Sequence, residues 1–216
     1  MTDVEKISNN QYAQAIVDFH SIKTDQTNTS IVYLYNKDLN YYECDLGCIK
    51  LSKAIVDMLG DEGSKHKVDD ILYLIKFKTL EDLSKYNHRN CISLKNGIFD
   101  LDTLTFIESD PNQFISFRLD VVYDNSLDNT IWNEYVSSLV RSSDVLKLQE
   151  AFGNILTNHY ITKKLFYLYG SPNSGKSTFI NVNQNFMGKK NFSSLSLKDI
   201  EREGYGIANL FGKRSN

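Results

Sequence analysis

The residues best suited to chemistry gather in one stretch, GSPNSGKST, in the C-terminal part of the 216-residue chain. It fits the pattern G-x-x-x-x-G-K-[ST] without a mismatch, and its residues are Gly170, Ser171, Pro172, Asn173, Ser174, Gly175, Lys176, Ser177 and then Thr178. Glycines let the backbone curl so tightly that successive N–H groups converge on phosphate oxygens. Lys176 would contact the β- and γ-phosphates, and the Ser177 hydroxyl would bind Mg²⁺. The stretch therefore predicts a binding site for ATP and Mg²⁺.

Such a loop binds phosphate where it connects a β-strand to a helix. Leu165–Tyr169 before it is a continuous apolar and aromatic run of strand length. The segment STFINVNQNF after it places Phe179 and Val182/Asn183 at helical spacing, and the positive end of that helix would face the phosphates. The alternative is a Gly- and Ser-rich loop that fits the pattern by chance, but the sequence on both sides favours the phosphate loop.

Hydrolysis of ATP requires groups that the loop itself does not contain. A P-loop ATPase also uses an acidic residue on a neighbouring strand to hold Mg²⁺ and a residue that positions the attacking water. The only carboxylates after Ser177 are Asp199, Glu201 and Glu203, in the polar segment LKDIEREG. Because a metal-binding Asp belongs at the end of a buried parallel strand, we interpret these three as solvated surface charges. The sequence thus predicts nucleotide binding and assigns no catalytic residue.

The cysteines invite a metal site. Cys44 and Cys48, together with His88 and Cys91, would make a four-ligand zinc set. The two pairs are far apart in the sequence and Cys44 lies in a predicted strand, so we favour free thiols, buried or partly buried.

A second candidate metal motif is IFDLD, Ile98–Asp102. It has the hydrophobic–Asp–x–Asp form with which primases and polymerases hold two metal ions. Asp100 and Asp102 also suit a tight turn, where Asp side chains bond the local backbone, and we favour this turn interpretation.

The elements up to residue 89 are predicted mainly from periodicity. Residues 1–10 are expected to be disordered. The predicted elements that follow are a helix in QYAQAIVDF, strands Ile31–Tyr35 and Tyr41–Cys44 joined by a polar turn, helices in KLSKAIVDMLGDEG and VDDILYLIKF, and a short polar helix in TLEDLSKYN. Leu51, Ile55 and Met58/Leu59 share one helix face, and Gly60 suits the C-cap.

From Asn90 onward the pattern changes to strands and then to helices. Apolar and polar residues alternate around Asn96-Gly97, which predicts a hairpin because both residues tolerate a positive φ. A turn near Asp102–Leu104, a strand around Phe106–Glu108 and a strand in QFISFRLDVVYD complete this part.

Two helices precede the loop. Their apolar stripes are Trp132, Tyr135/Val136 and Leu139 in the first, and Val145, Leu148, Phe152 and Ile155 in the second. Stripes of this kind usually face a core, so we interpret them as packing rather than as a cofactor site. Ser142, Ser143 and Asp144 offer N-caps for the second helix.

Composition places the chain among ordinary globular proteins. It has 41% hydrophobic and 24% charged residues and a net charge of −3, which does not indicate a basic nucleic-acid binder. The basic pairs Lys163-Lys164, Lys189-Lys190 and Lys213-Arg214 are dispersed as on solvated faces, and binding of single-stranded DNA stays open. The N-terminus MTDVEKISNN lacks the apolar core of a signal peptide, no run is long enough to span a membrane, and three cysteines suit a reducing compartment. We therefore expect a cytoplasmic protein with no membrane partner.

Several segments, in this order, resemble the phage and plasmid primase–helicase family: NGIFDLDT, IWNEYV, LQEAFGNILT, LFYLYGSPNSGKST and SLSLKDI…GIANLFGKRSN. Its members join a superfamily 3 helicase core to a preceding module like that of poxvirus primase-helicases. The resemblance covers Asn90 to Asn216. It implies an ATP loop at Gly170–Thr178, a homo-oligomeric ring that moves along single-stranded DNA, and a role in replication of a virus, phage or plasmid.

The expected domain organisation has three parts, of which only the second and third lie within the resemblance. Residues 1–89 form a mixed α/β region of unknown role, residues 90–160 a hairpin plus helical module, and residues 161–216 an incomplete P-loop NTPase core. The expected fold class is α/β, with a mixed α+β N-terminal module of small antiparallel hairpins and helices. The first strand–loop–helix unit of a P-loop NTPase follows it.

The resemblance implies a metal-binding strand directly after LFGKRSN, and the sequence ends there, at Asn216. We therefore expect an N-terminal part, or a shortened relative, of a replicative DNA helicase that binds ATP and joins a ring or a longer helicase chain. The alternative is a non-enzymatic interaction or oligomerisation module of a replication complex with a remnant P-loop. A small P-loop kinase is disfavoured, because little chain follows Lys176 to build an acceptor site and lid.

Overall fold

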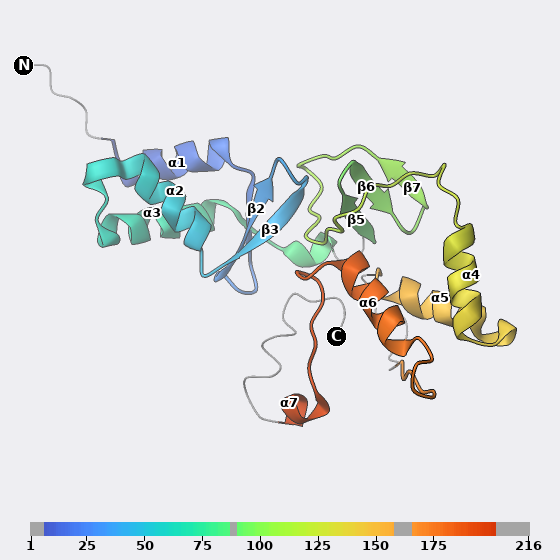
Figure 1. Cartoon of the computed structure of the whole chain (residues 1–216). Coiled ribbons are helices and arrows are strands. Elements are labelled where there is room, and N and C mark those ends of the chain that lie inside the picture. The colour runs from blue at the N-terminus through green and yellow to red at the C-terminus, as the bar shows by residue number, and fades with distance from the viewer. Residues whose placement is uncertain (1–6, 87–89, 158–165, 202–216) are drawn as a thin grey trace, which may run out of the picture. The chain divides into compact units, whose positions relative to one another are not determined.

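The computed structural model describes residues 7–86, 90–157 and 166–201 (Figure 1). The chain divides into two compact units: the first holds the residues up to His88 together with Ser109–Ser116, and the second holds Arg89–Glu108 and the residues from Phe117 onward. Each unit combines helices with a small sheet, which confirms the mixed α+β part of the prediction. Within the described ranges, no helix has both the length and the apolar character needed to cross a bilayer.

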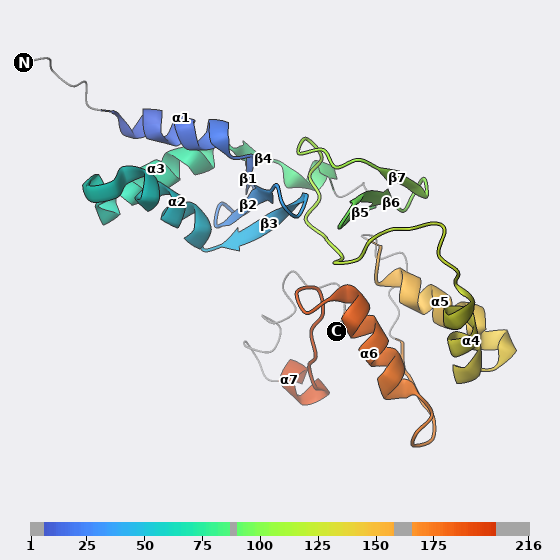
Figure 2. The ribbon, with the colours of Figure 1, turned by 45° about the horizontal axis from the view of Figure 1, so that its top comes forward.

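The first unit packs three helices beside a four-stranded sheet (Figure 2). Its elements are α1 (Asn9–Phe19), β1 (Ile22–Asp25), β2 (Ile31–Asn36), β3 (Tyr41–Leu46), α2 (Ile49–Leu59), η1 (Gly60–Glu62), α3 (Lys65–Lys78), β4 (Leu80–Glu81) and η2 (Leu83–Tyr86). The strand order is β3-β2-β1-β4; β2 is antiparallel to both β1 and β3, whereas β1 and β4 are parallel. The three longer helices and the two strands that the sequence predicts here are confirmed.

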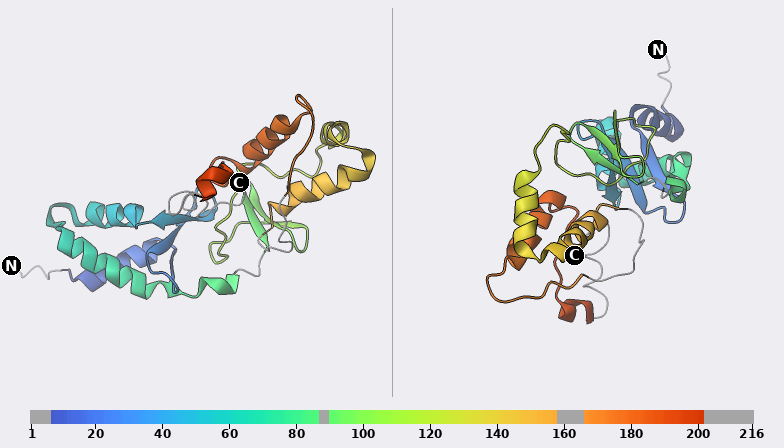
Figure 3. Two further views of the ribbon diagram at one scale, coloured as in Figure 1. Left: turned by 90° about the horizontal axis from the view of Figure 1, so that it is seen from below. Right: turned by 90° about the vertical axis from the view of Figure 1, so that its right-hand side faces the viewer.

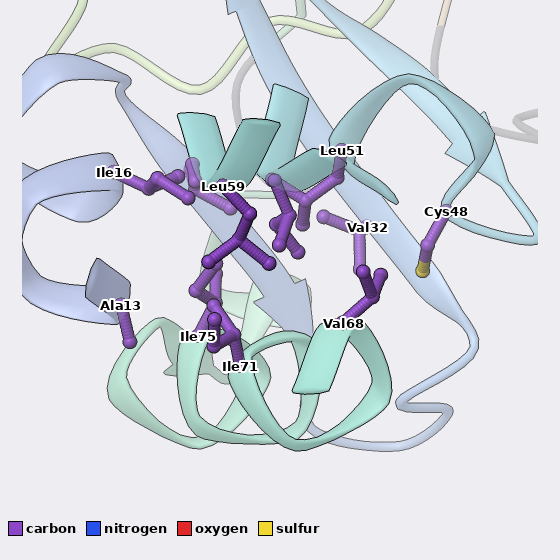
Figure 4. Packing of buried hydrophobic residues seen from close by; sticks show 11 residues of the cluster. Ala13, Ile16, Val32, Cys48, Leu51, Leu59, Val68, Ile71 and Ile75 are labelled. Carbon is purple, nitrogen blue, oxygen red and sulfur yellow. The ribbon is translucent and has the colours of Figure 1, made fainter. Parts of the chain in front are cut away.

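Apolar side chains at helical spacing build the core of this unit (Figure 4). Leu51, Ile55 and Leu59 are buried on one face of α2, as their periodicity predicts, while Met58 is exposed. Gly60 ends the helix with a φ of 53°, which glycine adopts without strain. The other buried members of the cluster are Ala13, Ile16, Ile22, Val32, Cys48, Val68, Ile71 and Ile75.

The first helix begins earlier than the sequence predicts. Ser8 is its N-cap: the Ser8 hydroxyl accepts a hydrogen bond from the Gln11 N–H, and the Gln11 side chain accepts one from the Ser8 N–H. This capping box satisfies backbone donors that would otherwise lack partners. The predicted disorder is therefore wrong for Asn9 and Asn10, and residues 1–6 lie outside the described residues.

The segment TLEDLSKYN is not the single polar helix that was predicted. Its start forms the two-residue strand β4, which pairs with β1 through hydrogen bonds from the Thr24 N–H to the Thr79 carbonyl and from the Gln26 N–H to the Glu81 carbonyl. Only the following residues are helical, as the 3₁₀ turn η2. The edge of the sheet at β1 is available for pairing, which local periodicity does not reveal. Pairing with this edge makes the start of the segment a strand and not a helix.

A partly buried ion pair joins the two parallel strands. Lys23 on β1 donates to Glu81 on β4 at 2.6 Å, and Lys85 and the Tyr86 hydroxyl donate to the same carboxylate. Burial opposes ionisation of Glu81, but the hydrogen bonds from Lys23, Lys85 and Tyr86 outweigh it and lower its pKa to about 2. Glu81 therefore stays ionised in the folded chain at pH values where an unfolded Glu is protonated.

This lowered pKa predicts an acid-sensitive contribution to stability. The contribution is complete above the ordinary Glu pKa of 4.5 and is lost as the pH falls from there toward about 2, since the unfolded chain then binds the proton more tightly. Glu81→Gln is expected to flatten this part of a plot of unfolding free energy against pH, measured by urea denaturation. The control is Glu134→Gln on an exposed helix position, which should leave the slope unchanged; equal slopes for both variants would contradict the assignment.

The second unit contains a three-stranded meander and the helices around the candidate loop (Figure 3). Its elements are β5 (Cys91–Leu94), β6 (Gly97–Asp100), β7 (Thr105–Ile107), α4 (Thr130–Leu139), η3 (Ser142–Asp144), α5 (Val145–Asn154), α6 (Lys176–Met187) and α7 (Leu197–Glu201). The strands pair in the order β5-β6-β7, all antiparallel, so the predicted meander is confirmed. Both predicted helices before the loop are also present, although Asp144 caps α5 without a side-chain hydrogen bond.

The hairpin turn differs from the predicted one. Lys95 and Asn96 make the turn, Gly97 already pairs with Leu94, and neither Asn96 nor Gly97 has a positive φ. Glycine is needed for another reason: a Cβ at position 97 would lie 2.5 Å from the Phe106 ring and 2.7 Å from the Ile107 carbonyl oxygen. The close approach of β7 therefore selects the glycine.

The predicted strand in QFISFRLDVVYD is present only as an extended segment. Its residues Phe117, Leu119 and Val121 form backbone hydrogen bonds with Ser93 on β5 and with Lys95 in the turn after it, but among the described residues only one parallel bridge, Ser93 with Arg118, satisfies the pairing geometry. Phe117 and Leu119 are buried, and Arg118 between them is less so, which is the alternation that the sequence shows.

Candidate nucleotide-binding site

The candidate loop ends where α6 begins. Gly175 is the N-cap of α6 with a φ of 83°, and Asn173 also has a positive φ, 61°. Asn and Gly tolerate this left-handed backbone better than other residues, so both sequence positions suit the turn that they make. At the other end of the loop, a Cβ on Gly170 would lie 2.9 Å from the Ser174 hydroxyl oxygen, which shows how closely the loop closes on itself.

Lys176 lies across this loop. Its ammonium group donates to the Gly170 carbonyl at 3.0 Å, the Ser171 carbonyl at 2.7 Å and the Ser174 hydroxyl at 3.1 Å. Within the described part of the chain all three acceptors are neutral, and Lys176 has no carboxylate partner. A phosphate group would form stronger, charge-assisted hydrogen bonds with this ammonium.

The first turn of α6 offers further donors. The N–H groups of Lys176, Ser177 and Thr178 precede the first hydrogen bond of the helix, which the Phe179 N–H donates to the Gly175 carbonyl. The side chains of Ser177 and Thr178 are exposed. Among the described residues, the loop therefore combines a cation without a carboxylate partner, N–H groups at the start of a helix and an accessible hydroxyl, as an anion site with a metal ion requires.

The strand predicted before the loop is not formed by the residues described there. Phe166–Tyr169 have no regular secondary structure, and Tyr167 and Tyr169 are 81% and 89% exposed; Leu165 lies outside the described residues. An apolar run of this length becomes a strand only beside another strand, and no described strand pairs with it. Of the predicted strand–loop–helix unit, the described residues therefore form the helix but not the strand, and phosphate binding by the loop stays a prediction.

Helix α6 is fixed by its buried face. Phe179, Asn183 and Met187 are buried, which confirms the helical spacing predicted for Phe179 and Asn183. Met187 packs in a cluster with Ile92, Leu94, Phe117 and Leu119. The Asn191 side chain donates to the Arg118 and Met187 carbonyls at 2.7 and 2.8 Å, so β5 and the extended segment that contains Arg118 hold the far end of the helix that begins at the loop.

A cleft of about 760 Å³ lies between α5, α6 and the segment before the loop. Its apolar lining includes Phe152, Ile155, Phe166, Leu168 and Phe179. Phe152 contacts both Trp132 on α4 and Phe186 on α6, with ring centroids 5.0 and 5.1 Å apart. The predicted packing is therefore confirmed for Val136, Trp132 and Phe152, whereas α5 has no fully buried residue and its Phe152 and Ile155 also line the cleft.

The carboxylates after the loop have no metal-site geometry among the described residues. Asp199 accepts hydrogen bonds from the Ser196 N–H and hydroxyl, and these bonds lower the pKa of Asp199. This arrangement caps the short helix α7. Glu201 is exposed, and Glu203 lies outside the described residues.

The two other candidate metal motifs are the IFDLD segment and the set of cysteines with His88. The Asp100 carboxylate accepts hydrogen bonds from the N–H groups of Asp102 and Thr103, at 2.9 and 3.1 Å, which confirms the turn interpretation for Asp100. Cys48 and Cys91 are buried and Cys44 is exposed, all as free thiols, while His88 lies outside the described residues. Although Cys44 is exposed as a whole residue, partial desolvation of its thiol and then the negative charge of the neighbouring Asp45 raise the pKa of this thiol.

The predicted basic pairs are only partly within the described residues. Lys189 and Lys190 follow α6 and are exposed, whereas Lys163-Lys164 and Lys213-Arg214 lie outside the described residues.

One contact near the loop is not predicted by the sequence: Leu139, assigned to a packing stripe, lies against Gly175. The helical spacing of the α4 stripe predicts that Leu139 faces other residues, but no sequence signal indicates that it contacts Gly175.

Comparison with known proteins adds a family match. A protein-family model described as D5 N terminal like matches residues 8–140, more than half of the chain. The matched range includes residues 8–89, whose motifs alone suggest no family, and it ends at the C-cap of α4, before the loop. A search of curated proteins found no match.

Proposed function

Because the chain belongs to the D5 N-terminal-like family, we propose that it is a DNA replication protein of the helicase type that binds ATP and Mg²⁺. The family's domain is associated with phage and viral primase-helicase replication proteins. The loop that follows this domain carries the residues Gly170, Ser171, Pro172, Asn173, Ser174, Gly175, Lys176, Ser177 and Thr178.

The observation that carries the proposal is the set of hydrogen-bond partners of the Lys176 ammonium group. This ammonium group lies at the start of a helix, after two residues with a positive φ, and all its partners among the described residues are neutral, so it is arranged to receive an anion. In the proposed complex Lys176 contacts the β- and γ-phosphates, the loop N–H groups surround them, and Ser177 binds Mg²⁺. The bound metal ion would neutralise phosphate charge.

The wider proposal places this site in a helicase assembly. ATP binding would accompany association into a ring, or with a longer helicase chain, and the ring would hold single-stranded DNA. The carboxylates described after the loop give no Mg²⁺-holding strand, so the proposal for this chain is nucleotide binding and not hydrolysis.

The second candidate is an interaction module with a remnant loop. One observation favours it: residues Phe166–Tyr169, which should form the strand beneath the loop, are exposed and outside any sheet. In this case the family domain would mediate assembly in a replication complex, and ATP would not bind.

Equilibrium binding of ATP to the 216-residue chain separates the two candidates. Isothermal titration with Mg²⁺ present is expected to give a micromolar Kd for ATP and much weaker binding of AMP, because AMP lacks the β- and γ-phosphates that Lys176 would contact. Light scattering with and without ATP–Mg²⁺ reports assembly in the same samples. Absence of ATP binding at millimolar concentration would overturn the nucleotide proposal and favour the interaction module.

A further inference from the structure

Helix α4 ends against the candidate loop. Leu139 is its last residue, and the Leu139 side chain occupies the space beside Gly175 where any other residue would carry its Cβ. A Cβ built on Gly175 would lie 2.5 Å from Leu139 Cδ2, far inside normal van der Waals contact. The leucine therefore packs directly on the backbone of the loop.

The contact lies at the residue of the loop that precedes the helix α6. Gly175 has a positive φ and is the N-cap of α6, so its conformation sets the direction in which the N–H groups of Lys176 and Ser177 point. A side chain packed on Gly175 restricts the rotations that would open this turn. A loop that is already ordered loses less conformational entropy when it binds phosphate.

Leu139 is itself held by a packed helix. Val136, one turn earlier on α4, is fully buried, and Trp132 contacts the Phe152 ring on α5. Phe152 in turn contacts Phe179, which follows the loop on α6, with ring centroids 6.2 Å apart. Contacts on two sides thus keep α4 in place beside the start of α6.

We infer that Leu139 is a positioning residue of the nucleotide site, through which the D5 N-terminal-like domain sets the shape of the phosphate loop. The inference rests on the proposed function. It goes further because Leu139 lies within the matched range 8–140 and the loop lies outside it, so the family domain contributes directly to a site that is not part of it.

The test compares Leu139→Ala with the wild type in the 216-residue chain. We expect its affinity for ATP–Mg²⁺ to fall by about 10-fold or more, because loss of pre-organisation at a binding loop has effects of this order. Binding of inorganic tripolyphosphate should fall by the same factor, since the loop holds phosphates and not the base. Leu139→Met, which retains a long apolar side chain, should restore both affinities.

The control is Ile131→Ala, on the same helix but 82% exposed, which should bind as the wild type does. Melting temperatures of all variants identify any general loss of folding. If the wild type binds ATP and Leu139→Ala binds it equally well, the inference is wrong while the proposed function stands. If the wild type binds neither ATP nor tripolyphosphate, the proposed function fails and the role of Leu139 with it.

A double variant tests the contact itself. Gly175→Ala should lose affinity because alanine is strained at a positive φ and because its new methyl group meets the end of the Leu139 side chain, which must move aside. In Leu139→Ala/Gly175→Ala the collision is removed, so this variant should bind ATP no more weakly than Gly175→Ala alone. If the loss of affinity in the double variant equals the product of the losses in the two single variants, the two positions act independently, which contradicts the inference.

Discussion

Replacing Lys176 by alanine is expected to weaken ATP binding by at least about 100-fold. A hydrogen bond to a charged group contributes about 1.5–3 kcal/mol, and Lys176 would reach two phosphates, so the loss is of the order of 3 kcal/mol, which corresponds to this factor. The same substitution should leave the melting temperature nearly unchanged, because the present partners of the ammonium are exposed and neutral. Titration calorimetry and thermal denaturation measure the two effects.

The matched control is Lys189→Ala. Lys189 is an exposed lysine that follows α6 and is outside the loop, so it tests the effect of losing one positive charge from the same unit. We expect less than about a twofold change in ATP affinity, since exposed charges at a distance are screened by salt. If both variants bind ATP as the wild type does, the proposed role of Lys176 is wrong.

The loop was predictable because its properties are local. The pattern itself specifies the glycine that left-handed backbone at position 175 favours, and a helix follows because Phe179, Asn183 and Met187 recur at its spacing. The contact of Leu139 with Gly175 was not predictable. It joins positions far apart in the sequence, and a leucine in a helical stripe carries no information about which neighbour it meets.

Strands were predictable only where local signals were strong. β2 and β3 were recognised by β-branched and aromatic residues on either side of a polar turn, and β5 and β6 by alternation around a turn. β1 and β4 are short; β1 becomes a strand because it lies between β2 and β4, and β4 becomes one because β1 lies beside it. Phe166–Tyr169 show the converse: a strand-like composition without a described partner strand gives no strand.

The family match explains why the two halves of the chain yielded unequal information. Nucleotide chemistry imposes residue types at fixed positions, so a short motif between Gly170 and Ser177 is sufficient to suggest it. The first unit imposes only an apolar pattern on its core, as at Leu51, Ile55 and Leu59, and many sequences satisfy such a pattern. Its membership of the D5 N-terminal-like family became visible only from comparison over residues 8–140.

The largest effect on stability is expected at the centre of the first core. Ile71 on α3 has no exposed surface and packs in the cluster that includes Ile16 and Ile55 (Figure 4). Ile71→Ala would remove buried methyl groups and leave a cavity that the surrounding helices fill only in part. We expect the free energy of unfolding to fall by about 3–4 kcal/mol, measured by urea denaturation followed by circular dichroism.

Asp69→Ala is the matched control, because Asp69 is exposed on the same helix; a change within about 0.5 kcal/mol is expected for it. A loss at Ile71 no larger than that at Asp69 would mean that α3 does not pack as described.

The comparison also separates folding from nucleotide binding. Ile71 belongs to the first unit and the loop to the second, so Ile71→Ala should retain the ATP affinity of the wild type under conditions where it is folded. Lys176→Ala should show the reverse, with stability kept and affinity lost, and this opposite pair of outcomes would assign the two properties to different residues of the chain.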